Sequence, residues 1–508
     1  HPERAQRVEG SALDPPPHHP TNPLTSMPSL DRLAREALFA NGFIPEAGEA
    51  VVREVAGLED APSRGEGARD LRQLAWSSID NATSRDLDQM EVAEELSDGA
   101  VVLRIGIADV DALVPKGSAV DAHAATNGTS VYTGVSVYPM LPERLSTDLT
   151  SLNEGEDRLV IVIEVELGAD GAVRRHDVYR ALASNLAKLA YESVGPWLEG
   201  QGAEPEKLVA SDSLEAQLWL QDRAASLLKR VRLQAGALEF ETVEATPVAK
   251  DGKVESLAVT RKNRARDLIE DFMIAANVAI AQLLAERGRS AIRRVVRAPR
   301  RWDRIVTIAR EYGFTLPEQP NALALSYFLG QRRAVDPTRF PDLSLSIVKL
   351  LGPGEYVLDK PGPSDDQPHF GLAATDYTHA TAPNRRYADL VTQRLVKAAI
   401  AGAPAPYTDD ELGAIAKQCT DRENAANRVE RVTRKAAAAE LLAHRIGNVF
   451  HAIVTGVKKD GTYVRLLSPP AEGRVVRGEE GMDVGERVSV RLVRTDPLKG
   501  HIDFEGLR

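Results

Sequence analysis

The chain has 508 residues, of which 43% are hydrophobic and 27% charged, enough apolar material for one large core and one or two smaller domains. No run of 18 or more apolar residues occurs, so we expect no membrane association. The only cysteine, Cys419, excludes an intrachain disulfide and an all-cysteine metal site and favours a cytoplasmic location. The net charge of −11 argues by itself against a polyanionic partner, but the local distribution of charge matters more.

The first part of the chain divides into a polar leader and two short helices. Residues 1–26 carry six prolines and lack apolar periodicity, which predicts a disordered leader or an artificial remnant outside the fold. Ser29 can cap a helix, and two amphipathic helices are expected within 29–57. They are too short for a core of their own. We therefore expect a small helical domain over 27–66 that docks on the main body or forms part of a winged-helix unit.

Residues 67–445 mix strands and helices without repeats, which predicts one large α/β domain. Its clearest elements are buried strands at 101–110 and 159–167 and helices at 266–286, 387–402 and 408–446. The helix at 266–286 is apolar on nearly all sides, as expected inside a large domain.

An arginine-rich segment interrupts this domain. Residues 287–304 hold eight arginines and a single acid, Asp303. The segment is either a solvated basic surface or a wall that follows a polyanion.

The last residues, 446–508, change character. Short alternating runs separated by glycines predict five strands that close into a small barrel of the OB type. The predicted fold is thus a multidomain α+β protein, with a large mixed α/β domain between a small helical domain and a five-stranded barrel.

An acidic segment, "SSIDNATSRDLDQM" at 77–90, carries Asp80, Asp86 and Asp88 and ends in Gln89. Ionised carboxylates this close together need a counter-charge, and oxygen ligands without His or Cys favour a hard ion such as Mg²⁺ or Mn²⁺. The alternative is a solvated turn whose aspartates bond to their own backbone. A calcium-binding EF-hand loop is excluded because the glycine of its sharp turn is replaced by Arg85.

A pair of arginines follows a proline in "YTHATAPNRRYADL", residues 377–390. Pro383 and Asn384 are placed to begin a helix, which would put Arg385 and Arg386 in its first turn. Basic side chains are disfavoured there unless an anion such as phosphate binds at the helix start. The alternative is a bond to a structural carboxylate such as Asp389. A metal site and a phosphate site together would suit hydrolysis of a phosphodiester.

These two segments resemble the signatures of the ribonuclease II / ribonuclease R (RNB) family of 3′→5′ exoribonucleases. "IDNATSRDLDQM" is similar to the acidic signature and "YTHATAPNRRYADLVTQR" to the second one. The segments 130–167 and 265–284 also follow the order and spacing of the family, so the resemblance covers about 70–480. It implies processive hydrolysis of single-stranded RNA to nucleoside 5′-monophosphates with a divalent metal, normally Mg²⁺, by a protein that we expect to be a monomer.

The resemblance also implies catalytic roles. Asp80, Asp86 and Asp88 match three of the four catalytic acids and metal ligands, with Asp88 the most important, and Arg385 matches the arginine that engages the scissile phosphate. Gln89 stands where the fourth aspartate is usual; its amide oxygen can ligate a metal but brings no charge, so one of two metal positions is in doubt. A catalytically inactive RNA-binding protein on the same scaffold is the alternative.

Five further RNA contacts are implied in the same way. Tyr132 and Phe240 match the two aromatic residues that clamp the last nucleotide, although such residues are more often core residues and only the motif context favours the clamp. Glu270 and Asn277 match polar residues of the helix that lines the RNA channel, and Arg386 lies beside the catalytic arginine. The family usually has two cold-shock barrels upstream, and the residues before 67 are too few for one, so we expect a short form without them. The C-terminal barrel resembles an RNA-binding domain of the S1 type.

Overall fold

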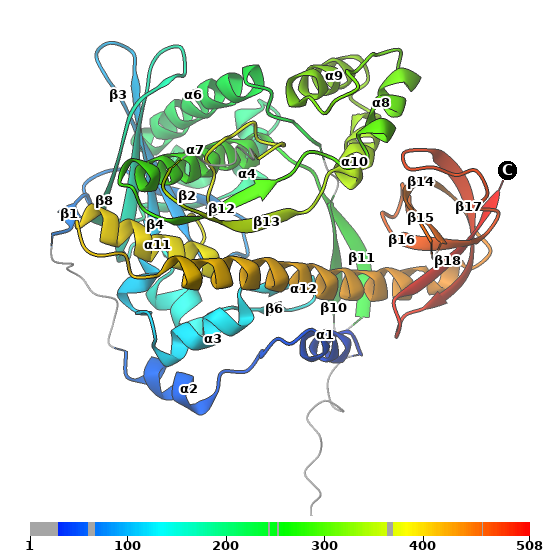
Figure 1. Ribbon diagram of the computed structural model, residues 1–508, viewed down its shortest axis with the longest axis horizontal. Coiled ribbons are helices and arrows are strands. Elements are labelled where there is room, and N and C mark those ends of the chain that lie inside the picture. The colour runs from blue at the N-terminus through cyan, green and yellow to red at the C-terminus, as the bar shows by residue number, and fades with distance from the viewer. Residues whose placement is uncertain are drawn as a thin grey trace, which may run out of the picture.

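The computed structural model describes residues 29–58, 67–241, 244–250, 253–362, 369–459 and 461–507. The predicted leader at 1–26 and most of the linker that follows the second helix lie outside these residues. The described chain forms a large α/β body, a helical lobe beside it and a small barrel at one end (Figure 1).

A seven-stranded mixed sheet forms the centre of the body, in the order β1-β8-β7-β4-β3-β2-β9. Its strands are β1 (Arg69–Asp70), β2 (Ser77–Asp80), β3 (Gln89–Glu95), β4 (Val101–Ala108), β7 (Asp157–Leu167), β8 (Val173–Ser184) and β9 (Ala187–Ala190). The central strands β4 and β7 are almost continuously buried, as their runs of Val, Ile and Leu predicted. The edge strand β1 pairs with β8 in parallel, and the other edge strand, β9, pairs with β2 in parallel. The strands from β8 to β2 pair with one another in the antiparallel direction.

Helices α4 (Tyr191–Leu198), α6 (Asp212–Gln234) and α7 (Arg264–Glu286) pack on this sheet, with the short α5 (Glu206–Val209) before α6. The side chain of Asn263 caps α7 by accepting the N–H of Arg266. By length and composition α7 could cross a membrane, but 67% of its most apolar window is buried inside the protein. It is therefore the core helix that its sequence predicted.

The remaining elements of the body bring distant segments together. They are α3 (Ala119–Asn127), β5 (Val131–Tyr132), β6 (Val137–Tyr138), a π-helical turn (Arg144–Leu149), β10 (Glu244–Lys250), β11 (Lys253–Thr260), β12 (Ala291–Val296), β13 (Gly354–Asp359) and α11 (Tyr387–Ile400), with a 3₁₀ turn at Val110–Ala112. Helix α11 is buried along most of its length and packs against α7 and β12.

Helix α12 (Asp409–Leu442) runs from the body to the barrel and ends in a 3₁₀ turn, Ala443–Arg445 (Figure 1). A capping box begins it: Thr408 accepts the N–H of Glu411, and the Glu411 carboxylate accepts the N–H of Thr408. The barrel then closes in the order β14-β15-β16-β18-β17. Its strands, β14 (Val449–Lys458), β15 (Gly461–Leu466), β16 (Glu472–Arg477), β17 (Arg487–Asp496) and β18 (His501–Leu507), confirm the predicted five.

A lobe of three helices joins the body to the barrel. It comprises α8 (Trp302–Glu311), α9 (Ala322–Val335) and α10 (Phe340–Leu350) around a separate apolar cluster that includes Val484 of the barrel. Arg304 donates to the main-chain oxygen of Val484 at 2.9 and 2.6 Å, and Lys349 lies 3.1 Å from Glu472. The barrel is thereby fixed against the lobe.

The two N-terminal helices, α1 (Ser29–Ala40) and α2 (Glu49–Ala56), form where the sequence predicted them. Leu38 of α1 shares a cluster with Val429 of α12, and Val51 and Val55 of α2 belong to the main core. Residues 29–58 contain no strand, so within the described chain they dock on the body and form no winged helix.

The arginine-rich segment 287–304 is divided between internal ion pairs and exposed surface. Arg293 lies 3.1 Å from Asp376, and Arg294 binds Glu423 through both terminal nitrogens at 2.5 and 2.7 Å. Arg297 pairs with Glu355 and Arg304 with Glu311. Arg287, Arg300 and Arg301 are exposed, so the interpretation as a solvated basic surface holds for part of the segment.

Candidate active site

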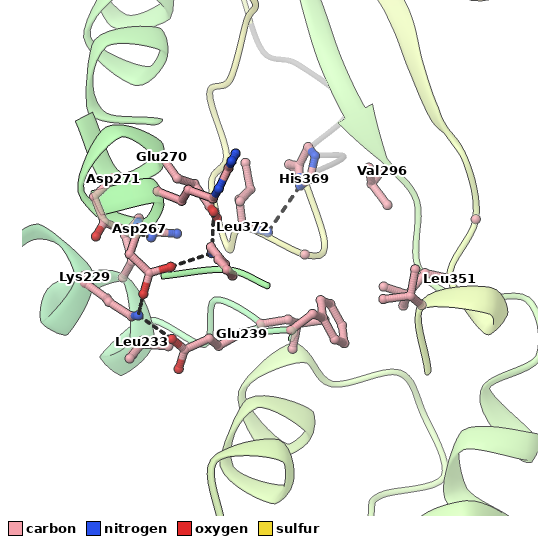
Figure 2. A pocket seen from close by; sticks show the side chains of 18 residues that line it. Lys229, Leu233, Glu239, Asp267, Glu270, Asp271, Val296, Leu351, His369 and Leu372 are labelled. Atoms are coloured by element: carbon pink, nitrogen blue, oxygen red, sulfur yellow. Dashed lines mark hydrogen bonds and ion pairs between the residues drawn. The ribbon is translucent and has the colours of Figure 1, made fainter. Parts of the chain in front are cut away.

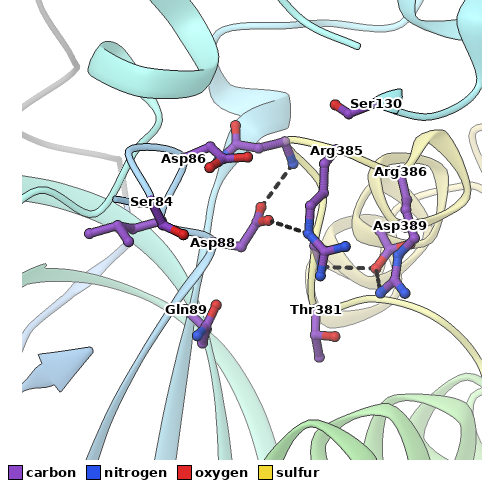
Figure 3. Close-up of polar contacts among 12 residues, drawn as sticks. Ser84, Asp86, Asp88, Gln89, Ser130, Thr381, Arg385, Arg386 and Asp389 are labelled. Atoms are coloured by element: carbon purple, nitrogen blue, oxygen red, sulfur yellow. Dashed lines mark hydrogen bonds and ion pairs between the residues drawn. The ribbon is translucent and has the colours of Figure 1, made fainter. Parts of the chain in front are cut away.

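Asp88 lies where the acidic segment meets the arginine pair. Its carboxylate accepts the main-chain N–H of Asn384 at 3.0 Å through Oδ1 and lies 3.4 Å from Nε of Arg385 through Oδ2 (Figure 3). The side chain is 3% exposed, and burial raises its pKa to about 7 although Arg385 and the Asn384 N–H lower it. Two segments far apart in the sequence thus converge on one buried carboxylate.

Asp80 and Asp86 flank this carboxylate from the loop between β2 and β3. Asp80, at the end of β2, accepts the N–H of Asn81 at 2.6 Å and the hydroxyl of Ser84 at 3.0 Å. These are the bonds expected for a turn whose aspartates bond to their own backbone and neighbours. Burial nevertheless raises its pKa, with Asp86 adding to the rise and Arg385 opposing it. The three aspartates therefore share one electrostatic environment.

The arginine pair precedes helix α11, because the chain at 383–385 forms a turn and the helix begins only at Tyr387. The prediction of two arginines in a first helical turn was therefore wrong. Arg385 is 43% exposed in its side chain and faces Asp88, whereas Arg386 is the residue before the helix and bonds Asp389 at 2.7 Å.

Arg386 makes the bond to a structural carboxylate, that of Asp389, which was the alternative to phosphate binding. Its guanidinium is largely buried and pairs with the fully buried carboxylate of Asp389. Arg386 also lines the cavity beside Tyr132 and Arg385, and its contact with RNA stays a prediction. The same Asp389 carboxylate also accepts the N–H of Ala382 at 2.8 Å, which fixes the turn that carries Arg385.

Asn277 also supports this turn. The residue is 2% exposed, its amide oxygen accepts the N–H of Ala380 at 2.8 Å, and its amide nitrogen lies 3.3 Å from the Tyr377 hydroxyl. The amide of Asn277 is used by the loop, and its expected contact with RNA stays a prediction. Its position on α7 ties the core helix to the segment that ends at Arg385.

Tyr132 and Phe240 line different cavities. The hydroxyl of Tyr132 donates to Asp86 at 3.2 Å, and its ring is 39% exposed beside a cavity of about 230 Å³ that Arg385 and Tyr356 also line. Phe240 lines a second cavity of about 510 Å³ together with Glu270. The structure thus keeps both aromatic residues at cavities but does not bring them into one clamp.

The larger cavity has a charged side and an apolar side (Figure 2). Lys229, Asp267 and Glu270 gather on the charged side, where Lys229 lies 2.8 Å from Asp267 and Lys262 pairs with Glu270. Val296 and Leu351 lie on the opposite side (Figure 2). Such a cavity offers charged groups for polar atoms and apolar surface for a flat ring.

Strand β3 carries two buried polar residues: Gln89, which the sequence indicated as a metal ligand, and Glu91, which it did not. Gln89 is 8% exposed and its amide nitrogen donates to the main-chain oxygen of Ile79 at 3.4 Å. Glu91 is fully buried, and burial together with Asp80 raises its pKa well above the ordinary value. A carboxylate between the apolar residues of "MEVA" was the available indication.

The donor chemistry of the site fits a hard divalent cation. Its acids offer only oxygen, and burial disfavours the ionised forms of Asp80, Asp88 and Glu91, which a nearby cation would favour. Within the described ranges no three His, Cys, Asp or Glu side chains converge closely enough to form a complete cage. Mg²⁺ commonly takes one or two carboxylates with waters and phosphates, so the residues fit it without such a cage.

Comparisons with known proteins agree with this geometry. The RNB domain family matches residues 68–402, and the RNase II-type exonuclease C-terminal S1 domain matches residues 448–506. Ribonuclease R of Thermotoga maritima is 30% identical over 94% of this chain and 70% of its own length. Ribonuclease R of Escherichia coli is 30% identical over 90% of this chain, which spans 60% of that relative.

A solved structure shares the fold. Mycoplasma genitalium RNase R in complex with ribose-methylated single-stranded RNA superposes with a TM-score of 0.84 at 22% identity, covering 94% of this chain and 78% of the other. At that identity the likeness concerns the fold. The match to the RNB domain covers well over half of the sequence, so this chain belongs to the RNB family and ends in an S1-type barrel.

Proposed function

We propose that this chain is a 3′→5′ exoribonuclease that processively hydrolyses single-stranded RNA and releases nucleoside 5′-monophosphates. One observation carries the proposal: Asp88 bonds the Asn384 N–H and lies 3.4 Å from Arg385, so carboxylates and an exposed guanidinium face one point. The family membership and the names of the relatives support the same reaction class.

Arg385 is the residue that engages the scissile phosphate. Its side chain is 43% exposed, so it can donate to phosphate oxygens while its Nε stays beside Asp88. A guanidinium in this place stabilises the negative charge that builds on those oxygens in the transition state. The Arg386–Asp389 pair and Asn277 keep the turn rigid, which holds Arg385 in position.

Asp80, Asp86 and Asp88 would hold the divalent cation, Mg²⁺ with Mn²⁺ as a substitute, through oxygen ligands. When bound, such an ion supplies an activated water and stabilises the leaving oxygen. The chain contributes the buried position of Asp88, which strengthens electrostatic interactions by excluding water, and the Tyr132 hydroxyl, which orients Asp86.

Single-stranded RNA suits the two cavities beside Arg385 and Phe240. Unstacked bases gain about 1–3 kcal/mol each from aromatic contacts. Tyr132 and Phe240 would therefore contact different parts of the RNA terminus, while Glu270, on the rim of the larger cavity, meets polar groups of the nucleotide. The S1-type barrel would contribute further contacts to the strand, and we expect the protein to act as a monomer.

A second candidate function is RNA binding without catalysis. Gln89 favours it, because an uncharged amide replaces an acid at the site, and Asp80 is engaged by its own turn. Arg385 and three intact aspartates favour catalysis.

Incubation of a 5′-labelled oligoribonucleotide with and without Mg²⁺ separates the two. The exoribonuclease shortens the labelled strand stepwise from its 3′ end and releases nucleoside 5′-monophosphates only with the metal. A strand that is bound but stays intact at every metal concentration would assign the protein to the second function, and internal cleavage products would contradict both.

A further inference from the structure

Strand β3 brings Glu91 to the same face as Gln89, since side chains alternate along a strand and the two residues are two positions apart. Glu91 is 0% exposed, and neither of its carboxylate oxygens has a hydrogen-bond partner among the described residues. An unpartnered buried carboxyl group is costly, and in native structures such a group calls for an explanation.

The neighbours of Glu91 give no structural explanation. Ser77 lies directly opposite in the register of β2, yet its hydroxyl is also buried without a partner, so the carboxyl does not turn to it. Gln221 of α6 donates at 3.4 Å to the main-chain oxygen of Glu91 instead of to its side chain. The Glu91 carboxyl therefore bonds neither of these two polar side chains.

The strands give the position of Glu91. It lies two positions after Gln89 in β3, and it pairs with Ser77 of β2, the strand that ends at Asp80. Asp80 raises the pKa of Glu91, which agrees with a position close to the acidic loop.

We propose that Glu91 supplies the carboxylate that position 89 lacks, and that it holds the divalent cation of the site together with Asp80. Two carboxylates with waters and RNA phosphate oxygens satisfy the ordinary needs of Mg²⁺. The inference rests on the proposed function, since it assigns a further residue to the same reaction.

Substitution Glu91→Gln tests it with a readout other than turnover. Binding of Mn²⁺ alone, followed by electron paramagnetic resonance, should weaken by about 10- to 100-fold, the effect typical of losing a group that supports a metal site. Raising the metal concentration should recover part of the lost RNA degradation. Glu94→Gln is the matched control, because Glu94 lies on the same strand, is exposed and pairs with Arg104 at 3.0 Å. Unchanged Mn²⁺ binding in folded Glu91→Gln protein would overturn the proposal.

A second pair of variants does not depend on the folding of Glu91→Gln. If Glu91 already supplies the missing carboxylate, Gln89→Asp in the natural background should change Mn²⁺ affinity by less than about 3-fold. In the Glu91→Gln background the same substitution should restore affinity and degradation. Tightening of 10-fold or more by Gln89→Asp alone would show that the site lacks a carboxylate, which contradicts the proposal.

Different results would contradict the exonuclease function and the role of Glu91. Mononucleotide release by the natural protein tests the proposed function. Absence of that release with intact Mn²⁺ binding would refute the exonuclease and leave the Glu91 site standing. Release that is insensitive to Glu91→Gln, with equal Mn²⁺ binding, would refute only the role of Glu91.

Discussion

Nε of Arg385 lies 3.4 Å from Oδ2 of Asp88, and the residue before it, Asn384, donates its main-chain N–H to the other oxygen of the same carboxylate. The acidic loop and the arginine turn are therefore joined at a single side chain. Changes on either side of this contact should affect turnover while the fold is preserved.

Asp88→Asn should reduce RNA degradation by at least about 10²-fold, because it removes a charged ligand from the reacting centre. RNA binding should stay within a few fold, since the aromatic cavities are unaffected. Single-turnover rates and filter binding of the same RNA would measure the two effects. Parallel loss of binding and rate would indicate a folding defect and would argue against a catalytic role for Asp88.

Arg385→Ala should lower the rate by about 10²–10³-fold, as loss of a donor to the transition state does. Its free energy of unfolding should fall less than that of Arg386→Ala, because the Arg385 guanidinium is 43% exposed and Asp88, with a pKa of about 7, can take up a proton when the cation is lost. Urea unfolding beside single-turnover kinetics would show the separation. A large destabilisation with a small rate effect would reverse the assignment.

Arg386→Ala should mainly lower the free energy of unfolding and should affect the rate only indirectly. It leaves the fully buried Asp389 without its cation, and breaking a buried pair costs about 3–5 kcal/mol. Any loss of activity should follow from misplacement of the turn that carries Arg385. Comparison of the urea midpoints of Arg385→Ala and Arg386→Ala tests this directly, and equal midpoints would contradict the different roles assigned to the two arginines.

The buried His369 should account for part of the loss of stability at acidic pH. Burial lowers its pKa to about 4, against an ordinary value of about 6.5, so the unfolded chain binds the proton first as the pH falls. The stability from keeping this ring neutral is fully present above pH 6.5 and is lost as the pH falls towards 4. His369→Asn should therefore lose less stability between pH 7.5 and 5 than the natural protein, by urea unfolding at both values. His451→Asn, at an exposed barrel position, is the control; an identical decline in all three proteins would refute the prediction.

The sequence predicted the regular elements well because their patterns are local. Helix α7 has apolar residues on almost every side, and the barrel strands alternate between apolar and polar residues. The helix predicted at 387–402 begins at Tyr387 as expected, whereas the earlier start indicated by Pro383 and Asn384 was wrong. Pro383 is typical of a first helical position, but here it occupies a turn held by the Asp389 side chain, a contact from outside the local pattern.

The site was predictable in its residue types and less so in its pairings. Asp88 and Arg385 meet as the two motifs suggested, whereas Arg386 and Asn277 serve the turn. The partners of the arginine-rich segment, such as Glu423 for Arg294, are distant in sequence, so composition alone could not reveal which of its charges are paired. Glu91 was passed over because a lone acid in a strand is ordinarily a solvent-facing residue.

The central claim is that Asp88 and Arg385 act on the same phosphodiester. The most direct test is a double-mutant cycle of single-turnover RNA degradation with Asp88→Asn, Arg385→Ala and the combined variant. Residues that act at one centre are strongly non-additive, so the double variant should lose scarcely more than the more damaging single one. A loss equal to the product of the two single losses would show that they act independently, and would contradict the account.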